Sequence, residues 1–260
     1  REEGRFPFWQ ELQTLSLSDN ITRTLHAHTL KAGILIDRSL SNAPGTSNFN
    51  GTFDFTRSGN NPFDTNHPYA NALVGVFYSY TESSTRPIRR FRQRTAEWFL
   101  QDNWKALRRL TLDYGVRFYW LKPVYERDNR LSTFLPERYD PAKKVALIEP
   151  RLVGGQRVGV HPVSGEVYPA AMIGAIAPGV GNPANGLLVV ADEPNYPRSM
   201  IEDRGVILAP RFGFAFDPRG RGTTALRGGF GMYYNRQNMS DIFVPFGNNP
   251  PMVENPIVYY

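Results

Sequence analysis

The 260-residue sequence contains no cysteine. Disulfide frameworks, thiolate catalysis and cysteine-ligated zinc are therefore excluded. No run of 18 or more apolar residues occurs, which excludes a membrane-spanning helix but not membrane-spanning strands, because strands carry apolar residues only at alternate positions. Lysine is also scarce, so the net charge of +6 is carried mainly by arginine, and the lysines are Lys31, Lys105, Lys122, Lys143 and Lys144. Arginine pairs with carboxylates and phosphates, so a barrel lumen, lipopolysaccharide and nucleic acid all remain open as partners.

Glycine, proline and aromatic residues are abundant. The sequence has 23 glycines and 21 prolines, and 13% of its residues are aromatic. This composition is typical of many strands and turns and predicts an all-β fold. The sequence begins at Arg1 without an initiating methionine or a signal segment and ends in an apolar stretch, so we expect an internal piece of a longer protein.

The clearest strand pattern is carried by residues 97–104 and 110–120, which read as facing strands joined by residues 105–109. In the second segment every even position is large and apolar, whereas the odd positions include Thr111 and Arg117, the period of two expected of a strand with two different faces. Ten steps of ~3.3 Å at a ~40° tilt give the apolar row a height of roughly 25 Å, the apolar band of an outer-membrane barrel.

Two further hairpins have the same design. Residues 28–38 alternate in the same way after a turn expected at 24–27, and a third hairpin is predicted within 207–235. Residues 49–56 and 76–81 read as short strands, and the pattern leaves open whether 49–84 is a spanning hairpin or a folded loop.

A long stretch without periodicity runs from residue 125 to residue 205. In a compact soluble domain so long an irregular loop counts against the strand assignments. A barrel with short periplasmic turns and long external loops is expected to contain such a stretch. We therefore predict an antiparallel transmembrane β-barrel portion over residues 1–260, with strands within 9–40, 89–122 and 207–235 and a long external loop at 125–205.

Four sequence blocks resemble the barrel of TonB-dependent outer-membrane receptors, most of all the Oar-like branch. Two are the hairpins Trp98-Phe-Leu-Gln-Asp-Asn-Trp-Lys105 with Leu110-Thr-Leu-Asp-Tyr-Gly-Val-Arg-Phe118, and Pro210-Arg-Phe-Gly-Phe-Ala-Phe-Asp217 with Leu226-Arg-Gly-Gly-Phe-Gly-Met-Tyr-Tyr234. The others are His28-Thr-Leu-Lys-Ala-Gly33 and Ala70-Asn-Ala-Leu-Val-Gly75. Each block is short, and the resemblance covers residues 9–120 and 207–235.

The resemblance implies a barrel of ~22 strands plugged by a globular domain. Such receptors import a scarce ligand, such as a siderophore, oligosaccharide or peptide, with inner-membrane energy delivered by a TonB-type coupler. This sequence would supply about 8 of the ~22 strands, with the plug absent from it. We expect outer-membrane localisation in a Gram-negative type of bacterium, with lipid and lipopolysaccharide as partners, and no nucleic acid.

The two faces of the predicted strands assign individual residues to the lumen side or to the lipid side. Lumen-facing candidates are Arg117, Arg211 and Arg227. Lipid-facing or interfacial girdle candidates are Trp98, Trp104, Trp120, Phe212, Phe214, Phe230 and Tyr234. We predict no catalytic residue, cofactor or metal site, because the histidines His26 and His28 lack a carboxylate block and no hydrolase or phosphate-loop motif occurs. The acidic residues Glu97, Asp102, Asp113 and Asp217 fall on strand faces or turns and are expected to pair with Arg117, Arg211 or Arg227.

The competing prediction is a soluble or surface-attached β-sandwich, such as an adhesin-like binding module. In that fold the apolar rows would form a core between two sheets, with Leu112, Val116, Phe212 and Phe230 buried in it. An all-β hydrolase would need a paired carboxylate cleft, which the sequence does not display.

Overall fold

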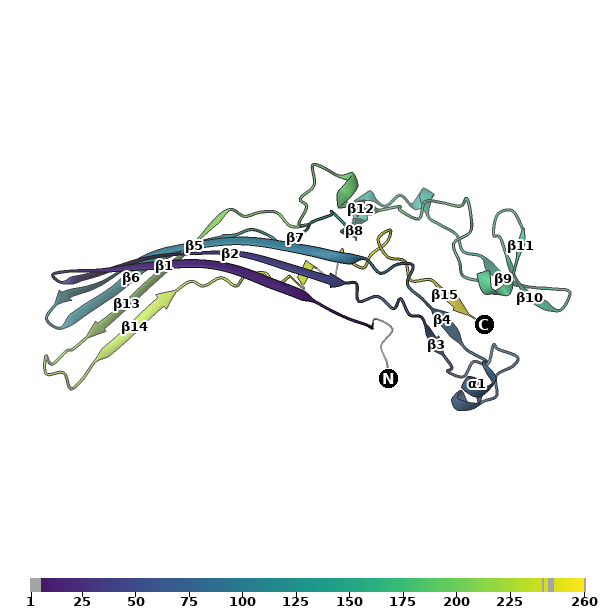
Figure 1. Ribbon diagram of the computed structural model, residues 1–260, viewed down its shortest axis with the longest axis horizontal. Coiled ribbons are helices and arrows are strands. Elements are labelled where there is room, and N and C mark those ends of the chain that lie inside the picture. The colour runs from purple at the N-terminus through teal and green to yellow at the C-terminus, as the bar shows by residue number, and fades with distance from the viewer. Residues whose placement is uncertain (1–5, 240, 243–245, 260) are drawn as a thin grey trace.

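The computed structural model describes residues 6–239, 241–242 and 246–259. Its main feature is a long, arched antiparallel sheet (Figure 1). The short strand β7 (Tyr125–Glu126) pairs with one end of the long strand β5 (Ile88–Leu107). The long strands, in their order across the sheet, are β1 (Glu11–Leu25), β2 (His28–Pro44), β5 (Ile88–Leu107), β6 (Leu110–Leu121), β13 (Val206–Phe216) and β14 (Leu226–Gly231). Within the described residues the sheet is not closed, and β1 and β14 form its edges.

The three hairpin turns of the sheet gather at one end of the arch, on the left in Figure 1. Residues 26–27 and 108–109 make two-residue turns, and residues 217–225 make the third. In the third turn the Asp217 carboxylate accepts hydrogen bonds from the backbone N–H groups of Arg219, Gly220 and Gly222. The long connections, residues 45–87 and 122–205, both leave the opposite end. Short turns and long loops therefore occupy opposite ends, as the sequence predicts.

Both long connections contain folded elements. Residues 45–87 carry β3 (Thr52–Asp54), α1 (Pro68–Val74) and β4 (Ser79–Thr81), and β15 (Ile257–Tyr259) pairs with β4. Segment 49–84 is therefore a folded loop, and of the eight strands expected, six cross the arch in the part of the chain described. Residues 127–205 hold β8 (Ser132–Phe134), β9 (Glu149–Val153), β10 (Gln156–Val160), β11 (Val167–Tyr168) and β12 (Leu187–Val189), with 3₁₀ turns at Pro136–Arg138, Pro141–Lys143, Ala170–Met172 and Val190–Asp192.

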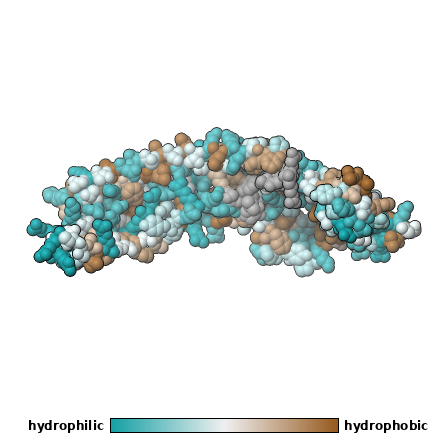
Figure 2. Space-filling view, turned by 90° about the horizontal axis from the view of Figure 1, so that it is seen from below, coloured by the Kyte–Doolittle hydropathy of each residue, from teal (hydrophilic) through white to brown (hydrophobic). Residues whose placement is uncertain are grey.

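The strand register gives the sheet one apolar and one polar face. Residues paired across antiparallel strands point to the same side, so Leu100 shares a face with its partners Ala32 and Val116. The neighbouring Gln101 lies on the other face, where its amide donates a 2.9 Å hydrogen bond to Asp113. In the space-filling view from below, hydrophilic and hydrophobic residues mix along the arch, and hydrophilic ones gather at the short-turn end (Figure 2).

The apolar face is uncovered in the described part of the chain. Leu100 is 57% exposed, Phe212 49% and Phe230 68%. A β-sandwich would bury these side chains between two sheets. The sandwich alternative is therefore wrong for this sheet. No helix among the described residues is long and apolar enough to cross a membrane.

The hydrophobic core lies at the loop end, on the polar-face side of the sheet. Phe91 of β5 is its contribution from the sheet, and Met239 and Phe246 pack at its border. The other buried members come from the loop 122–205 and from the segment after β14: Val124, Leu131, Leu188, Val190 and Ile242. The loops are thus anchored to the sheet by a small core of their own.

Candidate functional site

The segment after β14, residues 232–239, crosses the polar face of the sheet, and we call it the strap. The Met232 N–H still donates to the Pro210 carbonyl at 3.0 Å. Further along, Arg236 donates to Glu97 Oε1 through Nε at 2.8 Å and through Nη2 at 2.6 Å. Its Nη1 donates to Asp37 Oδ2. One side chain of the strap thus reaches two carboxylates, on β5 and on β2.

Arg117 of β6 completes an ion-pair quartet with Arg236, Glu97 and Asp37. Arg117 donates to Glu97 Oε2 through Nε at 2.9 Å and Nη2 at 2.6 Å. Glu97 is 4% exposed and Asp37 7%. Buried carboxylates are stable only when paired and hydrogen-bonded, and here two guanidinium groups balance two carboxylates. The quartet fastens the strap to the sheet.

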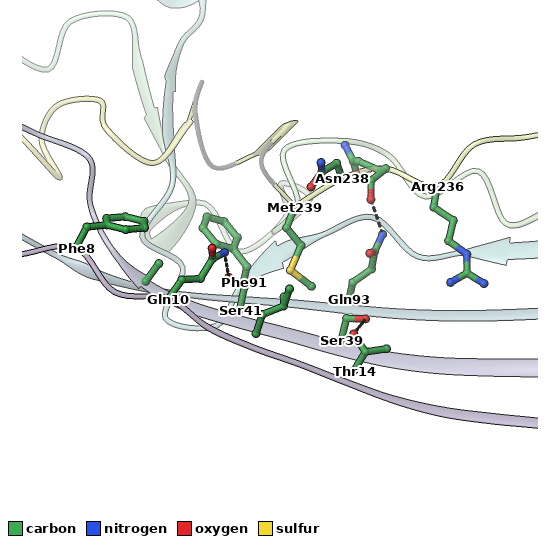
Figure 3. Close-up of a pocket in the computed structure, with 13 residues that line it drawn as sticks. Phe8, Gln10, Thr14, Ser39, Ser41, Phe91, Gln93, Arg236, Asn238 and Met239 are labelled. Atoms are coloured by element: carbon green, nitrogen blue, oxygen red, sulfur yellow. Dashed lines mark hydrogen bonds between the residues drawn. The ribbon is translucent and has the colours of Figure 1, made fainter. Parts of the chain in front are cut away.

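A pocket of about 570 Å³ lies beside the quartet, between the strap and the strands β1, β2 and β5 (Figure 3). Met239 points from the strap toward the sheet between Phe91 and Gln93. Gln93 donates to the Gln237 carbonyl at 3.3 Å, and the side chains on the floor bond to each other. Arg236 is the one charged side chain among the described residues that line the pocket, and its other polar lining groups are Gln10, Thr14, Ser39, Ser41, Gln93, Gln237 and Asn238.

This lining combines amide and hydroxyl groups with apolar surfaces from Phe8, Leu12, Phe91 and Met239. Sites for small ligands have this composition, with apolar walls giving contact area and a few polar groups fixing orientation. Arg236 is the one described charge in the lining, and it is already paired with Glu97 and Asp37, so the pocket suits an uncharged polar ligand.

The predicted lumen-facing arginines share the polar face but not one site. Arg117 belongs to the quartet. The guanidinium of Arg211 lies 4.7 Å from the ring centre of Tyr233, and Arg227 is exposed. Arg236 was missed, because it follows the last alternating segment and no pattern marks it. Which face lines a lumen stays a prediction.

The predicted lipid-facing aromatics lie on the apolar face, with one exception. Trp104, opposite His28, and Trp120, opposite Val206, mark the two ends of the apolar rows. The other predicted aromatics that share this face by register are Trp98, Phe212, Phe214 and Phe230. Contact of this face with lipid stays a prediction.

Tyr234 is the exception. Its ring meets Tyr119 edge-on at 5.8 Å, and Tyr119 shares the polar face through its pairing with Glu97. The assignment of Tyr234 to the apolar face was wrong because β14 ends at Gly231. Beyond that point the alternation of a strand no longer determines where a side chain points.

The pairing expected for the acidic residues holds for Glu97 but not for the others. Within the described part of the chain, Asp102 has no arginine partner. Its Oδ2 accepts a hydrogen bond from the Tyr114 hydroxyl at 2.9 Å and lies 2.6 Å from His28 Nδ1. Asp113 accepts from the amides of Gln101 and Asn103. His26 lies in the first turn with a φ of 52°. Among the described residues no group of three potential metal ligands occurs.

Comparison with known families decides the classification. The family described as "Outer membrane beta barrel domain" matches residues 2–260. The chain belongs to this family. The predicted β-barrel class and outer-membrane localisation of this outer membrane β-barrel domain are thereby confirmed. No curated protein and no solved structure matches the sequence.

Proposed function

We propose that this outer membrane β-barrel domain is part of a TonB-dependent receptor that binds a scarce ligand and imports it with inner-membrane energy. The observation that carries the proposal is the strap, held over the polar face by the quartet and bordered by a ligand-sized pocket. A segment crossing the lumen side narrows the passage and offers side chains to a ligand. A general diffusion pore has no need of such a pocket.

Two further features support a receptor. The two hairpin blocks that resemble TonB-dependent receptors form the hairpins β5–β6 and β13–β14, and the block at residues 70–75 forms most of α1. In addition, the loops are folded around a core of their own instead of being open coil. External loops with fixed structure favour recognition of a specific ligand.

The sheet also requires further strands in the membrane. The edge strands β1 and β14 have unpaired backbone groups within the described residues, and open edges are not tolerated in lipid. A larger barrel that pairs both edges satisfies this requirement. In that barrel the polar face would surround the lumen, and the quartet would hold the strap inside it.

The test is energised uptake by the full-length protein in a Gram-negative host without other receptors for the probes. Uptake of a labelled ferric siderophore, a maltooligosaccharide and a tripeptide is measured with and without a protonophore. We expect saturable uptake of one probe, lost when the protonophore removes the inner-membrane energy. A passive pore would instead admit all the probes, at rates that fall with probe size and do not change when the protonophore is added. That result would overturn the proposal.

A matched pair of variants connects uptake to the pocket. Thr14→Trp places a large ring in the pocket from β1. Thr24→Trp places the same ring on the same strand and the same face but outside the pocket. We expect Thr14→Trp to raise the half-saturating probe concentration at least tenfold and Thr24→Trp to leave it unchanged. Equal changes in the half-saturating concentration for the two variants would show that the pocket does not take part in transport.

A further inference from the structure

Three cationic residues stand side by side on the apolar face, at the loop end of its apolar rows. Arg38 of β2 and Arg94 of β5 are directly paired. The Lys122 N–H donates to the Arg94 carbonyl at 3.2 Å, so the row continues past the end of β6. One step toward the middle of the sheet, the same strands carry Ile36, Ala96 and Trp120. The row therefore borders the apolar surface directly.

The charge of this row is not balanced within the described residues. Lys122 Nζ is ion-paired with the Asp203 carboxylate and donates a hydrogen bond to it. That hydrogen bond holds the pKa of the Asp203 carboxyl below its usual range. Arg38 and Arg94 are exposed, and the described part of the chain places no carboxylate within ion-pair distance of either. Like charges directly opposite each other destabilise a strand pair. An external anion between the two guanidinium groups would relieve the repulsion.

A hollow of about 410 Å³ adjoins this row and contains Arg94 and Lys122 in its wall. Arg198 lines it as well, with its guanidinium 4.8 Å from the ring centre of Tyr125. Lys122 Nζ lies 4.9 Å from the ring centre of Trp120. Three cations thus line the hollow against one described carboxylate, Asp203. Trp120 and Tyr125 also line the hollow and give it an apolar side.

We propose that this row and hollow bind the phosphate group of a membrane lipid in the leaflet at the loop end. Guanidinium groups bind phosphate through paired hydrogen bonds. Basic residues at the boundary of an apolar band lie at the depth of lipid headgroups, where they attract anionic lipids. The phosphate bridges Arg38 and Arg94, and the acyl chains lie along Ile36 and Trp120. The proposal rests on the membrane location and is independent of ligand uptake.

The test measures lipid binding by the full-length protein in a neutral detergent. The probes are lipid A, phosphatidylglycerol and phosphatidylcholine in mixed micelles, and inorganic phosphate alone, with bound lipid counted by native mass spectrometry. We expect lipid A and phosphatidylglycerol to bind, and Arg38→Gln and Arg94→Gln each to weaken binding about fivefold. Arg108→Gln, an exposed arginine in the turn at the opposite end, is the matched control and should leave binding unchanged.

A second readout separates binding from misfolding. Without anionic lipid, Arg94→Gln should melt at the same temperature as the unmodified protein or higher, because it removes a like-charge pair. Phosphatidylglycerol should then raise the Tm of the unmodified protein more than that of Arg94→Gln. Equal weakening by Arg108→Gln, equal binding of phosphatidylcholine, or binding of inorganic phosphate as tight as that of lipid would each overturn the proposal.

Discussion

Arg117 donates two hydrogen bonds to a single carboxylate oxygen of Glu97, at 2.9 and 2.6 Å, although the two residues are diagonal neighbours and not a register pair. The other oxygen of Glu97 accepts two hydrogen bonds from Arg236. Glu97 therefore joins a strand of the sheet to the strap through both of its oxygens. It is the residue on which the polar-face site depends most.

Glu97→Gln should lower the free energy of unfolding by about 2 kcal/mol. Removing one partner of a fully buried ion pair costs about 3–5 kcal/mol of stability. The cost is smaller here because the Arg117 and Arg236 side chains are 26% and 38% exposed. Urea unfolding in lipid vesicles measures the change. Glu202→Gln is the control, because Glu202 is exposed, and it should change stability by less than about 0.5 kcal/mol.

Arg236→Gln should release the strap without unfolding the sheet. The variant loses the ion pairs to Glu97 and Asp37, whereas the strand ladders do not involve its side chain. Hydrogen exchange of residues 232–239 should become faster, with exchange in β5 and β6 unchanged. Arg227→Gln removes an exposed arginine from the same face and should change hydrogen exchange neither in the strap nor in β5 and β6. Unchanged exchange in the strap of Arg236→Gln would show that other contacts hold it.

Acid should weaken the third turn. The backbone N–H groups of Gly222, Gly220 and Arg219 hold the pKa of the Asp217 carboxyl below its usual range. A carboxyl whose pKa is lowered by folding stabilises the folded state above its unfolded pKa of about 3.9, and this contribution disappears as the pH falls through the lower folded value. Stability should therefore fall below about pH 4.

Asp217→Asn should show less of this acid-induced loss than the unmodified protein, because its side chain has no charge to titrate. The measurement is the urea midpoint at a series of pH values from 2 to 7. Asp192→Asn changes an exposed aspartate in the long loop and serves as the control. If Asp217→Asn lost as much stability in acid as the unmodified protein does, titration of Asp217 would not be the cause of the acid sensitivity.

The strands and their two faces were predictable because alternation is a local property. Trp104 and Trp120 follow from it, as does the separation of Leu100 from Gln101. Tyr234 does not, because the strand stops three residues earlier. The quartet also escaped sequence reasoning, since 139 residues separate Arg236 from Glu97. Contacts of that kind depend on how the chain returns over the sheet, which no local pattern records.

The folded loops show the same limit. Proline, glycine and asparagine predict that periodicity ends near residue 125, but not that Leu131 and Leu188 meet Phe91 in a core. Leu131 stands between Arg130 and Ser132, and Leu188 lies in a short apolar run, so neither has the period of two of a two-faced strand. Their burial follows from the position of the loop over the end of the sheet.

Two adjacent residues of β5 provide the sharpest test of lipid contact at the apolar face. Leu100 lies at mid-height on the apolar face, and Gln101 lies on the polar face beside Asp113. The free energy of unfolding in lipid vesicles is measured for Leu100→Arg and Gln101→Arg. We expect Leu100→Arg to cost about 2–4 kcal/mol and Gln101→Arg, which can pair with Asp113, to cost little. Because Leu100 is already 57% exposed, a small cost for both variants would mean that this face meets water and would contradict its contact with lipid.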